Sequence, residues 1–210
     1  MDLTHPYGRL QRRWRGARMR HFAETFGITR DTRVLDVGGT LWNWQFVPEL
    51  PRLTILNVMP SPEAAEGVTW IVGDGCSLPF DDGAFDIVFS NSVIEHLGSF
   101  EKQRAFAREV QRVGRRYYVQ TPNRWFPFEP HLLTPLVHYL PRAWQRPLYP
   151  YTLWALLSRP SRAEIDANYE QIRLLTRRQF ETLFPDATLI TERLALMPKC
   201  FVAQSGAASA

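Results

Sequence analysis

The chain has 210 residues, 45% of them hydrophobic, and carries a formal net charge of +4 at neutral pH. This composition is typical of a globular protein and excludes a disordered chain, and the length suits one domain with a substantial core. The sequence pI of about 9.3 does not by itself indicate nucleic-acid binding, because formal charge reports on solubility and non-specific attraction.

The spacing of the cysteines and the lack of long apolar segments indicate where in the cell the protein is expected. Cys76 and Cys200 are far apart and lack the spacing of a metal-ligand set or a disulfide framework, so we expect reduced thiols in a cytoplasmic protein. Residues 1–16 lack the apolar run of a signal peptide. No stretch has about 18 uninterrupted apolar residues, so we expect no transmembrane helix.

The first predicted element is an amphipathic helix over residues 9–26, with Gly27 as its stop. Its apolar residues recur at helical spacing among several arginines. Two interpretations of the arginine face are open. It forms a basic lid or a membrane-surface helix, or it is the solvated face of a packing helix, which is the usual role of a charge run.

Short apolar runs that alternate with helical segments predict a mostly parallel sheet built from right-handed βαβ units. The expected strands are 33–37, 53–58, 68–72, 85–89 and 116–120, and the expected helices between them are 40–50, 93–97 and 101–113. Further helices are expected over 161–175 and 176–184, followed by a C-terminal β-hairpin of 188–194 and 199–204 joined through Met197-Pro198.

A stretch rich in proline and aromatic residues, 125–157, interrupts this alternation after the fifth strand. Its prolines divide it into short helices and turns rather than one long element. We interpret it as an insertion that covers the sheet, and not as a second domain.

Polar residues stand where four of the predicted strands end. In chain order these are Asp36 with Gly38 and Gly39, then Asn57, then Asp74, then Ser90 with Asn91. Ligands of open α/β sheets bind at the carboxyl ends of the strands. The sequence therefore predicts a site for a small polar cofactor at this edge.

This order of strand ends resembles that of the class I S-adenosylmethionine-dependent methyltransferases over roughly residues 33–123. Residues 74–89 and their continuation, 90–97, are similar to the small-molecule branch of that family in particular. The resemblance implies an α/β, Rossmann-like methyltransferase fold: a mostly parallel seven-stranded sheet with a C-terminal β-hairpin and an inserted helical cap. It also implies S-adenosyl-L-methionine as cofactor. The glycine pattern G-x-G-x-x-G of nicotinamide-binding domains is absent.

The resemblance divides a single domain, 1–210, into functional segments. Residues 1–27 form an N-terminal helix and residues 33–123 the cofactor-binding core. Residues 125–175 form an acceptor-side cap, and residues 176–204 a C-terminal helix and hairpin.

The resemblance implies a cofactor-binding role for each strand end. Asp36 would take the ammonium group of the methionine end, directly or through water, and the glycines at 38 and 39 would allow close backbone approach. Asp74 would accept a hydrogen bond from the adenine amine, with the backbone of Gly75 and Cys76 against the ring.

The remaining strand ends include departures from the family pattern. Ser90 and Asn91 would offer backbone groups to the methionine moiety. Asn57 stands where the family carries an acid for the ribose, and it can accept and donate hydrogen bonds but has no charge. Thr40 and Trp42 replace further glycines of the loop. These departures motivate an alternative function, a catalytically degenerate binding or regulatory module.

Two histidines are candidates for a general base, the usual aid to methylation of a hydroxyl. We favour His131, with Glu129 nearby, and retain His96 as the second candidate. In the competing structural interpretation, Glu95 and His96 stabilise a loop and the other pair caps a helix. The sequence shows no metal-ligand cluster, so no metal is expected.

The predicted activity is methyl transfer by in-line displacement to a small, apolar or aromatic acceptor, at oxygen or carbon. Residues 90–93 lack the Asn/Asp-Pro-Pro-Tyr signature of many amino-group methylases. Aromatic side chains of the cap would wall the acceptor pocket, bury the cap against the sheet, or rest on a bilayer as a peripheral membrane contact: Trp125, Phe126, Phe128, Tyr139, Trp144, Tyr149, Tyr151 and Trp154. We expect a monomer or homodimer and no specific nucleic acid, with an RNA-modifying protein as a further alternative.

Overall fold

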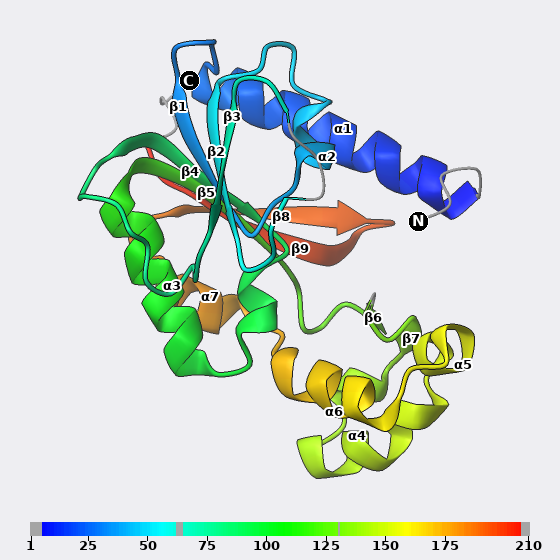
Figure 1. Cartoon of the computed structure of the whole chain (residues 1–210). Helices are drawn as coiled ribbons and strands as arrows, with labels where there is room; N and C mark the ends of the chain where they lie inside the picture. Colours follow the sequence, from blue (N-terminus) through cyan, green and yellow to red (C-terminus); the bar gives the residue numbers. More distant parts are fainter. Residues whose placement is uncertain (1–5, 62–64, 130, 207–210) are drawn as a thin grey trace. The chain divides into compact units, whose positions relative to one another are not determined.

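The computed structural model describes residues 6–61, 65–129 and 131–206, with side chains of the first helix described from residue 12 on (Figure 1). Predictions that concern residues 1–5, 62–64, 130 and 207–210, including the ends of the predicted domain 1–210, lie outside these residues.

The first half of the chain alternates strands and helices much as the sequence predicts. Its elements are α1 (Pro6–Phe26), β1 (Arg33–Val37), α2 (Leu41–Trp44), β2 (Arg52–Asn57), β3 (Val68–Val72), β4 (Phe85–Asn91), the 3₁₀ helix η1 (Ile94–Leu97), α3 (Phe100–Val113) and β5 (Gly114–Pro122). The helix expected over 40–50 is a single turn, because Pro48 and Pro51 disfavour helical backbone in the residues before them.

The second half contains the short elements that its prolines predict. These are β6 (Phe128–Glu129), β7 (Thr134–Pro135), η2 (Val137–Tyr139), α4 (Arg142–Leu148), η3 (Tyr149–Tyr151), α5 (Leu153–Ser158), α6 (Arg162–Gln171), α7 (Arg177–Leu183), β8 (Thr188–Leu194) and β9 (Met197–Gln204). The helix expected over 161–175 ends at Gln171, because the N–H of Arg173 donates to the carbonyl of Glu95 (2.7 Å) and not to a carbonyl within the helix.

The large sheet has seven strands in the order β3-β2-β1-β4-β5-β9-β8. β1 lies parallel to both of its neighbours, with Leu35 opposite Thr54 of β2 and Val88 of β4. β2 and β3 are also parallel. The predicted α/β fold with a mostly parallel, seven-stranded sheet is therefore confirmed.

The predicted C-terminal hairpin is confirmed with a shorter connection. β8 and β9 are neighbours joined by Ala195 and Leu196, whose φ angles of 47° and 70° are both left-handed. Two successive residues with positive φ match the twist of an antiparallel pair. Met197-Pro198, expected to lie in the connection, instead begins β9, a position that tolerates proline.

The chain forms two compact units. Of the described residues, the first contains 6–61, 65–91, 109–118 and 204–206; the second contains 92–108, 119–129 and 131–203. The single-domain organisation expected from the sequence stays a prediction. No helix in the described part of the chain is long and apolar enough to cross a bilayer.

An aromatic cluster forms the core of the first unit. The ring centroid of Phe22, on α1, lies 4.8 Å from that of Phe89 and 5.2 Å from that of Tyr118. Phe89 and Tyr118 stack with their planes 10° apart. Met19 and Phe26 are buried on the same side of the helix as Phe22. The predicted amphipathic helix is confirmed, and its apolar face covers the strands.

The second unit has a smaller core around Leu132, Tyr149 and Tyr169. The helix that carries Tyr169, α6, begins with a capping box between Ser161 and Glu164, which satisfies the first backbone N–H groups. This core holds the chain segment that follows β5, including Glu129.

Candidate functional site

The strand ends predicted to bind a cofactor lie at one edge of the first unit. Beyond β1, the N–H of Gly38 donates to the carbonyl of Leu56 (2.7 Å), and beyond β3 the N–H of Gly73 donates to the backbone carbonyl of Asn57, the last residue of β2 (3.0 Å). Because β1 to β4 form one parallel run, their carboxyl ends meet at that edge. The predicted cofactor-binding residues therefore belong to this unit: Asp36, Gly38, Gly39, Asn57, Asp74, Gly75, Cys76, Ser90 and Asn91.

Asp36 is fully buried and only partly hydrogen-bonded. Its Oδ2 accepts a hydrogen bond from the indole N–H of Trp44 at 2.8 Å, whereas Oδ1 has no hydrogen-bond partner among the described residues. Burial raises the pKa of this carboxyl to about 7, against the opposing effect of the Trp44 hydrogen bond. A buried oxygen without a donor suits a cationic ligand group such as an ammonium.

The two glycines after β1 are needed for different reasons. Gly38 adopts a φ of 77°, which L side chains rarely adopt. At Gly39, a Cβ atom would lie 1.9 Å from Oδ2 of Asp36. Any larger residue at 39 would displace the Asp36 carboxylate. The absence of a side chain at Gly39 thus leaves room for the Asp36 carboxylate. The close approach of a cofactor to Gly39, which the sequence predicts, is a separate role.

Asn57, the residue in place of the family's ribose-binding acid, links the loop after β1 to the loop after β2 by hydrogen bonds. Its Nδ2 donates to the carbonyl of Gly39 at 2.9 Å, and its Oδ1 accepts from the N–H of Met59 at 3.1 Å. Both ends of the amide are therefore engaged by backbone groups. Its proposed contact with the ribose stays a prediction.

Asp74 begins the turn that follows β3. Its Oδ1 accepts from the N–H of Cys76 at 2.8 Å, and its carbonyl accepts from the N–H of Ser77 at 3.1 Å. This side-chain turn holds the Gly75–Cys76 backbone that is predicted to lie against adenine. Arg112 fastens the following segment by donating to the carbonyls of Leu78 and Phe80.

Ser90 and Asn91 end β4 with their side chains engaged. The buried Ser90 hydroxyl donates to the carbonyl of Val37 at 3.0 Å, which joins the ends of β4 and β1. Asn91 Oδ1 accepts from Arg18 of α1 at 2.7 Å. The guanidinium of Arg15 lies 4.8 Å from the ring centroid of Trp42.

Part of the arginine face of α1 therefore contacts residues of the cofactor edge, as the lid interpretation requires. Sequence reasoning missed these contacts, because helical periodicity shows which residues share a face but not what that face meets.

A second cluster of titratable side chains lies within the second unit. His131 Nδ1 and Glu129 Oε1 are 2.5 Å apart, and Glu129 Oε2 accepts from the N–H of Leu132 at 2.6 Å. The rings of His96 and His131 meet edge to face with centroids 4.7 Å apart. The structure thus brings together the three candidate catalytic side chains.

The pKa values of the two histidines shift in opposite directions. Burial disfavours the charged form of His131, but the hydrogen bond to Glu129 and the charges of Glu129 and Glu95 outweigh it and raise its pKa. For His96, desolvation of the packed side of the ring and the nearby His131 charge lower the pKa.

Glu95, assigned only a structural role from the sequence, is the fourth member of this cluster. It is fully buried, and burial raises its pKa to about 7. Its Oε2 accepts from the hydroxyl of Thr121 at 3.0 Å, whereas Oε1 has no hydrogen-bond partner among the described residues. Ligand-type atoms of Glu95, His96 and His131 all lie within 4.8 Å of one another.

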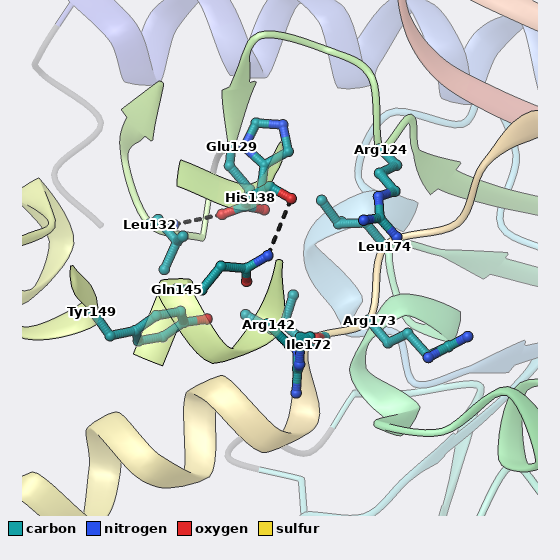
Figure 2. Close-up of a pocket in the computed structure, with 10 residues that line it drawn as sticks. All are labelled: Arg124, Glu129, Leu132, His138, Arg142, Gln145, Tyr149, Ile172, Arg173 and Leu174. Carbon is teal, nitrogen blue, oxygen red and sulfur yellow. Dashed lines mark hydrogen bonds between the residues drawn. The ribbon is translucent and has the colours of Figure 1, made fainter. Parts of the chain in front are cut away.

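A cavity of about 90 Å³ lies in the second unit. Figure 2 shows Glu129 and Gln145 among the side chains around it. Of the eight aromatic residues expected to wall an acceptor pocket, Tyr149 lines this cavity, whereas Trp125, Trp144 and Tyr151 are exposed. The aromatic wall of an acceptor pocket stays a prediction.

The strand order, the parallel registers and the strand-end residues define the fold of the class I S-adenosylmethionine-dependent methyltransferases. Residues 49–116 match the family model described as "Methyltransferase domain". These findings confirm the predicted resemblance, and S-adenosyl-L-methionine is the cofactor of that class.

The chain is similar to two curated proteins over part of their length. It is 31% identical over 113 residues to a provisionally named methyltransferase of Encephalitozoon cuniculi, covering 51% of this chain and 54% of that protein. It is 48% identical over 54 residues to ajmaline N-methyltransferase of Rauvolfia serpentina, covering 24% of this chain and 18% of that protein. The chain thus spans about half of the first relative and less than a fifth of the second.

Solved structures show the same fold at low sequence identity. The 1,6-didemethyltoxoflavin-N1-methyltransferase of Burkholderia thailandensis, with 1,6-didemethyltoxoflavin and S-adenosylhomocysteine bound, aligns with a TM-score of 0.57 and 13% identity, covering 92% of this chain and 76% of that one. A SAM-dependent methyltransferase of Aquifex aeolicus aligns with a TM-score of 0.50 and 13% identity, covering 89% and 87% of the two chains.

Proposed function

We propose that this protein is an S-adenosylmethionine-dependent methyltransferase that acts on a small molecule. The observation that carries the proposal is Asp36 at the carboxyl end of β1, whose buried Oδ1 has no donor in the part of the chain that the structure describes. An ammonium group would satisfy this oxygen. Asp74, at the end of β3, has a second carboxylate oxygen to accept from an adenine amine. These acceptors lie at the ends of β1 and β3, two strands separated by β2, and fit the two ends of the cofactor.

The sulfonium group of the bound cofactor supplies an already activated methyl group. The acceptor atom would form a bond to this methyl carbon, and the carbon–sulfur bond would break with its electron pair staying on sulfur. The protein's main task is to hold the two reactants in line. We propose oxygen or carbon as the acceptor atom. The names of two similar proteins specify N-methylation, so a nitrogen acceptor is the competing outcome.

For a hydroxyl acceptor, we propose that His131 takes the proton at Nε2. The hydrogen bond between its Nδ1 and Glu129 orients the ring and stabilises the protonated form. Glu129 is itself held by the N–H of Leu132. His96, edge to face with His131, is the second candidate for this role.

The direct test is calorimetry with S-adenosylmethionine, followed by transfer of a labelled methyl group to a panel of hydroxyl, carbon-acid and amine acceptors. We expect cofactor binding, with transfer to a hydroxyl or carbon acid. Absence of binding at millimolar cofactor would refute the proposal. Binding without transfer to any acceptor would favour the degenerate binding module, which the internal hydrogen bonds of Asn57 also support.

We further propose that the α4–α5 region contacts a lipid bilayer, where an apolar acceptor would be found. Trp144, Tyr151 and Leu157 are 66%, 74% and 69% exposed. An aromatic and leucine-rich surface suits the boundary of a bilayer. Arg159 lies along the same stretch and would favour anionic headgroups, whereas Arg146 is paired with Asp166 at 3.2 Å.

Sedimentation with phosphatidylglycerol-containing vesicles tests this contact. We expect the wild-type protein to sediment with vesicles and the double variant Trp144→Ser, Leu157→Ser to stay in solution. Leu196→Ser is the matched control, because Leu196 is an 87% exposed leucine in the β8–β9 turn. Equal sedimentation of the wild type and the double variant would exclude this surface. A cytoplasmic location, a monomer or homodimer, and the absence of a specific nucleic-acid partner stay predictions.

A further inference from the structure

The cluster in the second unit has the composition of a transition-metal site, although the sequence led us to expect no metal. We propose that Glu95, His96 and His131 bind a divalent transition-metal ion, for which Zn²⁺ is the probe. Glu95 and His96 come from η1, and His131 follows β6. Two imidazoles and one carboxylate form a ligand set that zinc uses in proteins.

The spacing of the cluster fits a single ion. The ligand-type atoms of the three residues lie within 4.8 Å of one another. Ligands bound at about 2.0–2.2 Å to one tetrahedral ion lie roughly 3–4 Å apart. Small side-chain rotations would therefore bring all three atoms to bonding distance.

The buried carboxylate of Glu95 independently indicates a missing partner. Its Oε1 is buried without a hydrogen-bond partner among the described residues, while Thr121 fixes Oε2. An unpaired carboxylate in such a place is costly unless it is neutralised or coordinates a cation. A bound ion would supply the positive charge that this oxygen lacks.

Glu129 acts on the proposed ion through His131. Its carboxylate oxygen lies 2.5 Å from Nδ1 of His131 and would accept a hydrogen bond from the Nδ1–H, which leaves the lone pair on Nε2 of the neutral ring for the ion. A carboxylate behind a ligating histidine is a common support of metal sites. Glu129 is thus a positioning residue and not a ligand.

His96 is an exposed residue, so one side of the cluster is accessible to solvent. An ion held by three protein ligands retains a position for water or for an acceptor oxygen. Nitrogen ligands favour Zn²⁺, Co²⁺ or Ni²⁺ over Mg²⁺, which prefers oxygen and retains its waters.

A role for the ion in catalysis rests on the proposed methyltransferase activity. An acceptor hydroxyl bound to the ion would become more acidic and lose its proton to solvent. His131 would then be a ligand and would not take the proton itself. If methyl transfer persists after the ion is removed, His131 is the group that takes the proton from the acceptor hydroxyl. The ion would then stabilise the structure without taking part in catalysis.

Ion binding is tested on the full-length protein after chelator treatment, by titration with Zn²⁺ and, separately, with Mg²⁺. We expect about one Zn²⁺ per chain and no Mg²⁺ binding at the same concentrations. Glu95→Gln and His96→Ala should each weaken Zn²⁺ binding at least tenfold, and Glu129→Gln should weaken it about 10–100-fold. His21→Ala is the matched control, since His21 is an exposed histidine outside the cluster.

Absence of Zn²⁺ binding, or equal affinity in the wild type and His96→Ala, would overturn the proposal. Because His96 is exposed, His96→Ala leaves no buried cavity, so a loss of Zn²⁺ binding would not result from misfolding. S-adenosylmethionine binding is measured on the same samples. Zn²⁺ binding without cofactor binding would refute the proposed function alone, and the opposite result would refute the ion site alone.

Discussion

The buried carboxyl of Asp36 predicts a pH-dependent stability that one substitution should remove. Its pKa is raised to about 7 in the folded protein, from an ordinary value of 3.8. The folded state therefore holds this proton over a pH range in which the unfolded chain has lost it. The contribution of Asp36 to stability is complete below the unfolded pKa and is lost as the pH rises through about 7.

The raised pKa of Asp36 gives the size of the change in the free energy of unfolding with pH. Each pKa unit corresponds to about 1.4 kcal/mol, so between about pH 5 and pH 8 the Asp36 carboxyl should lower the free energy of unfolding by about 3 kcal/mol. Asp36→Asn keeps the shape of the side chain and cannot ionise. Its free energy of unfolding should therefore fall by about 3 kcal/mol less than that of the wild type over the same range.

Urea denaturation of both proteins at several pH values measures this difference. The other buried acid with a raised pKa, Glu95, is present in both proteins and cancels in the comparison. Parallel pH profiles for the wild type and Asp36→Asn would refute the assignment of a raised pKa to Asp36. Calorimetry adds a second check, because an ammonium beside Asp36 favours its ionised form. Cofactor affinity of the wild type should rise about tenfold from pH 6 to pH 8, and that of Asp36→Asn should not.

Three further predictions concern the same unit. Asp74→Ala should weaken S-adenosylmethionine binding, measured by calorimetry, more than His131→Ala does; the reverse ranking would mean that the cofactor site is misplaced. Gly39→Ala should lower the free energy of unfolding by about 1–3 kcal/mol or more in a denaturant titration, because the new methyl group meets the Asp36 carboxylate, and an unchanged value would contradict that packing. Trp44→Phe should lower the free energy of unfolding by about 1–3 kcal/mol, because it removes the hydrogen bond to the Asp36 carboxylate. It should also raise the pKa of Asp36 further, which NMR titration of that carboxyl checks.

The strands of the sheet could be predicted from the sequence because their signal is local. Buried parallel strands are short apolar runs that end at glycine or polar residues, and both Arg33–Val37 and Val68–Val72 have the expected bounds. Helix ends were less predictable. Pro48 stops α2 after one turn, a local effect that an 11-residue aromatic-rich segment obscured.

The candidate site was only partly predictable, because its contacts join residues far apart in the chain. The spacing of Glu95 and His96 cannot show that Thr121 and His131 lie beside them. The sequence predicts Thr40 and Trp42 to be departures from the family's glycine loop. The structure shows that Trp44, a residue of the same segment to which the sequence assigned no role, is the donor that holds the Asp36 carboxylate. The loop that lacks the family's further glycines thus contains the hydrogen bond between Trp44 and Asp36, which a sequence motif cannot predict.

The composition of the first unit has a consequence for how the chain folds during synthesis. Phe22 and Phe89 leave the ribosome before Tyr118, which completes their aromatic cluster. Ser205 also belongs to this unit, and its hydroxyl accepts from the N–H of Tyr117. The apolar face of α1 therefore stays without its full set of partners until Tyr118 has been synthesised, when contacts distant in sequence close. Nascent chains that end before residue 114 should consequently be the species most dependent on chaperones.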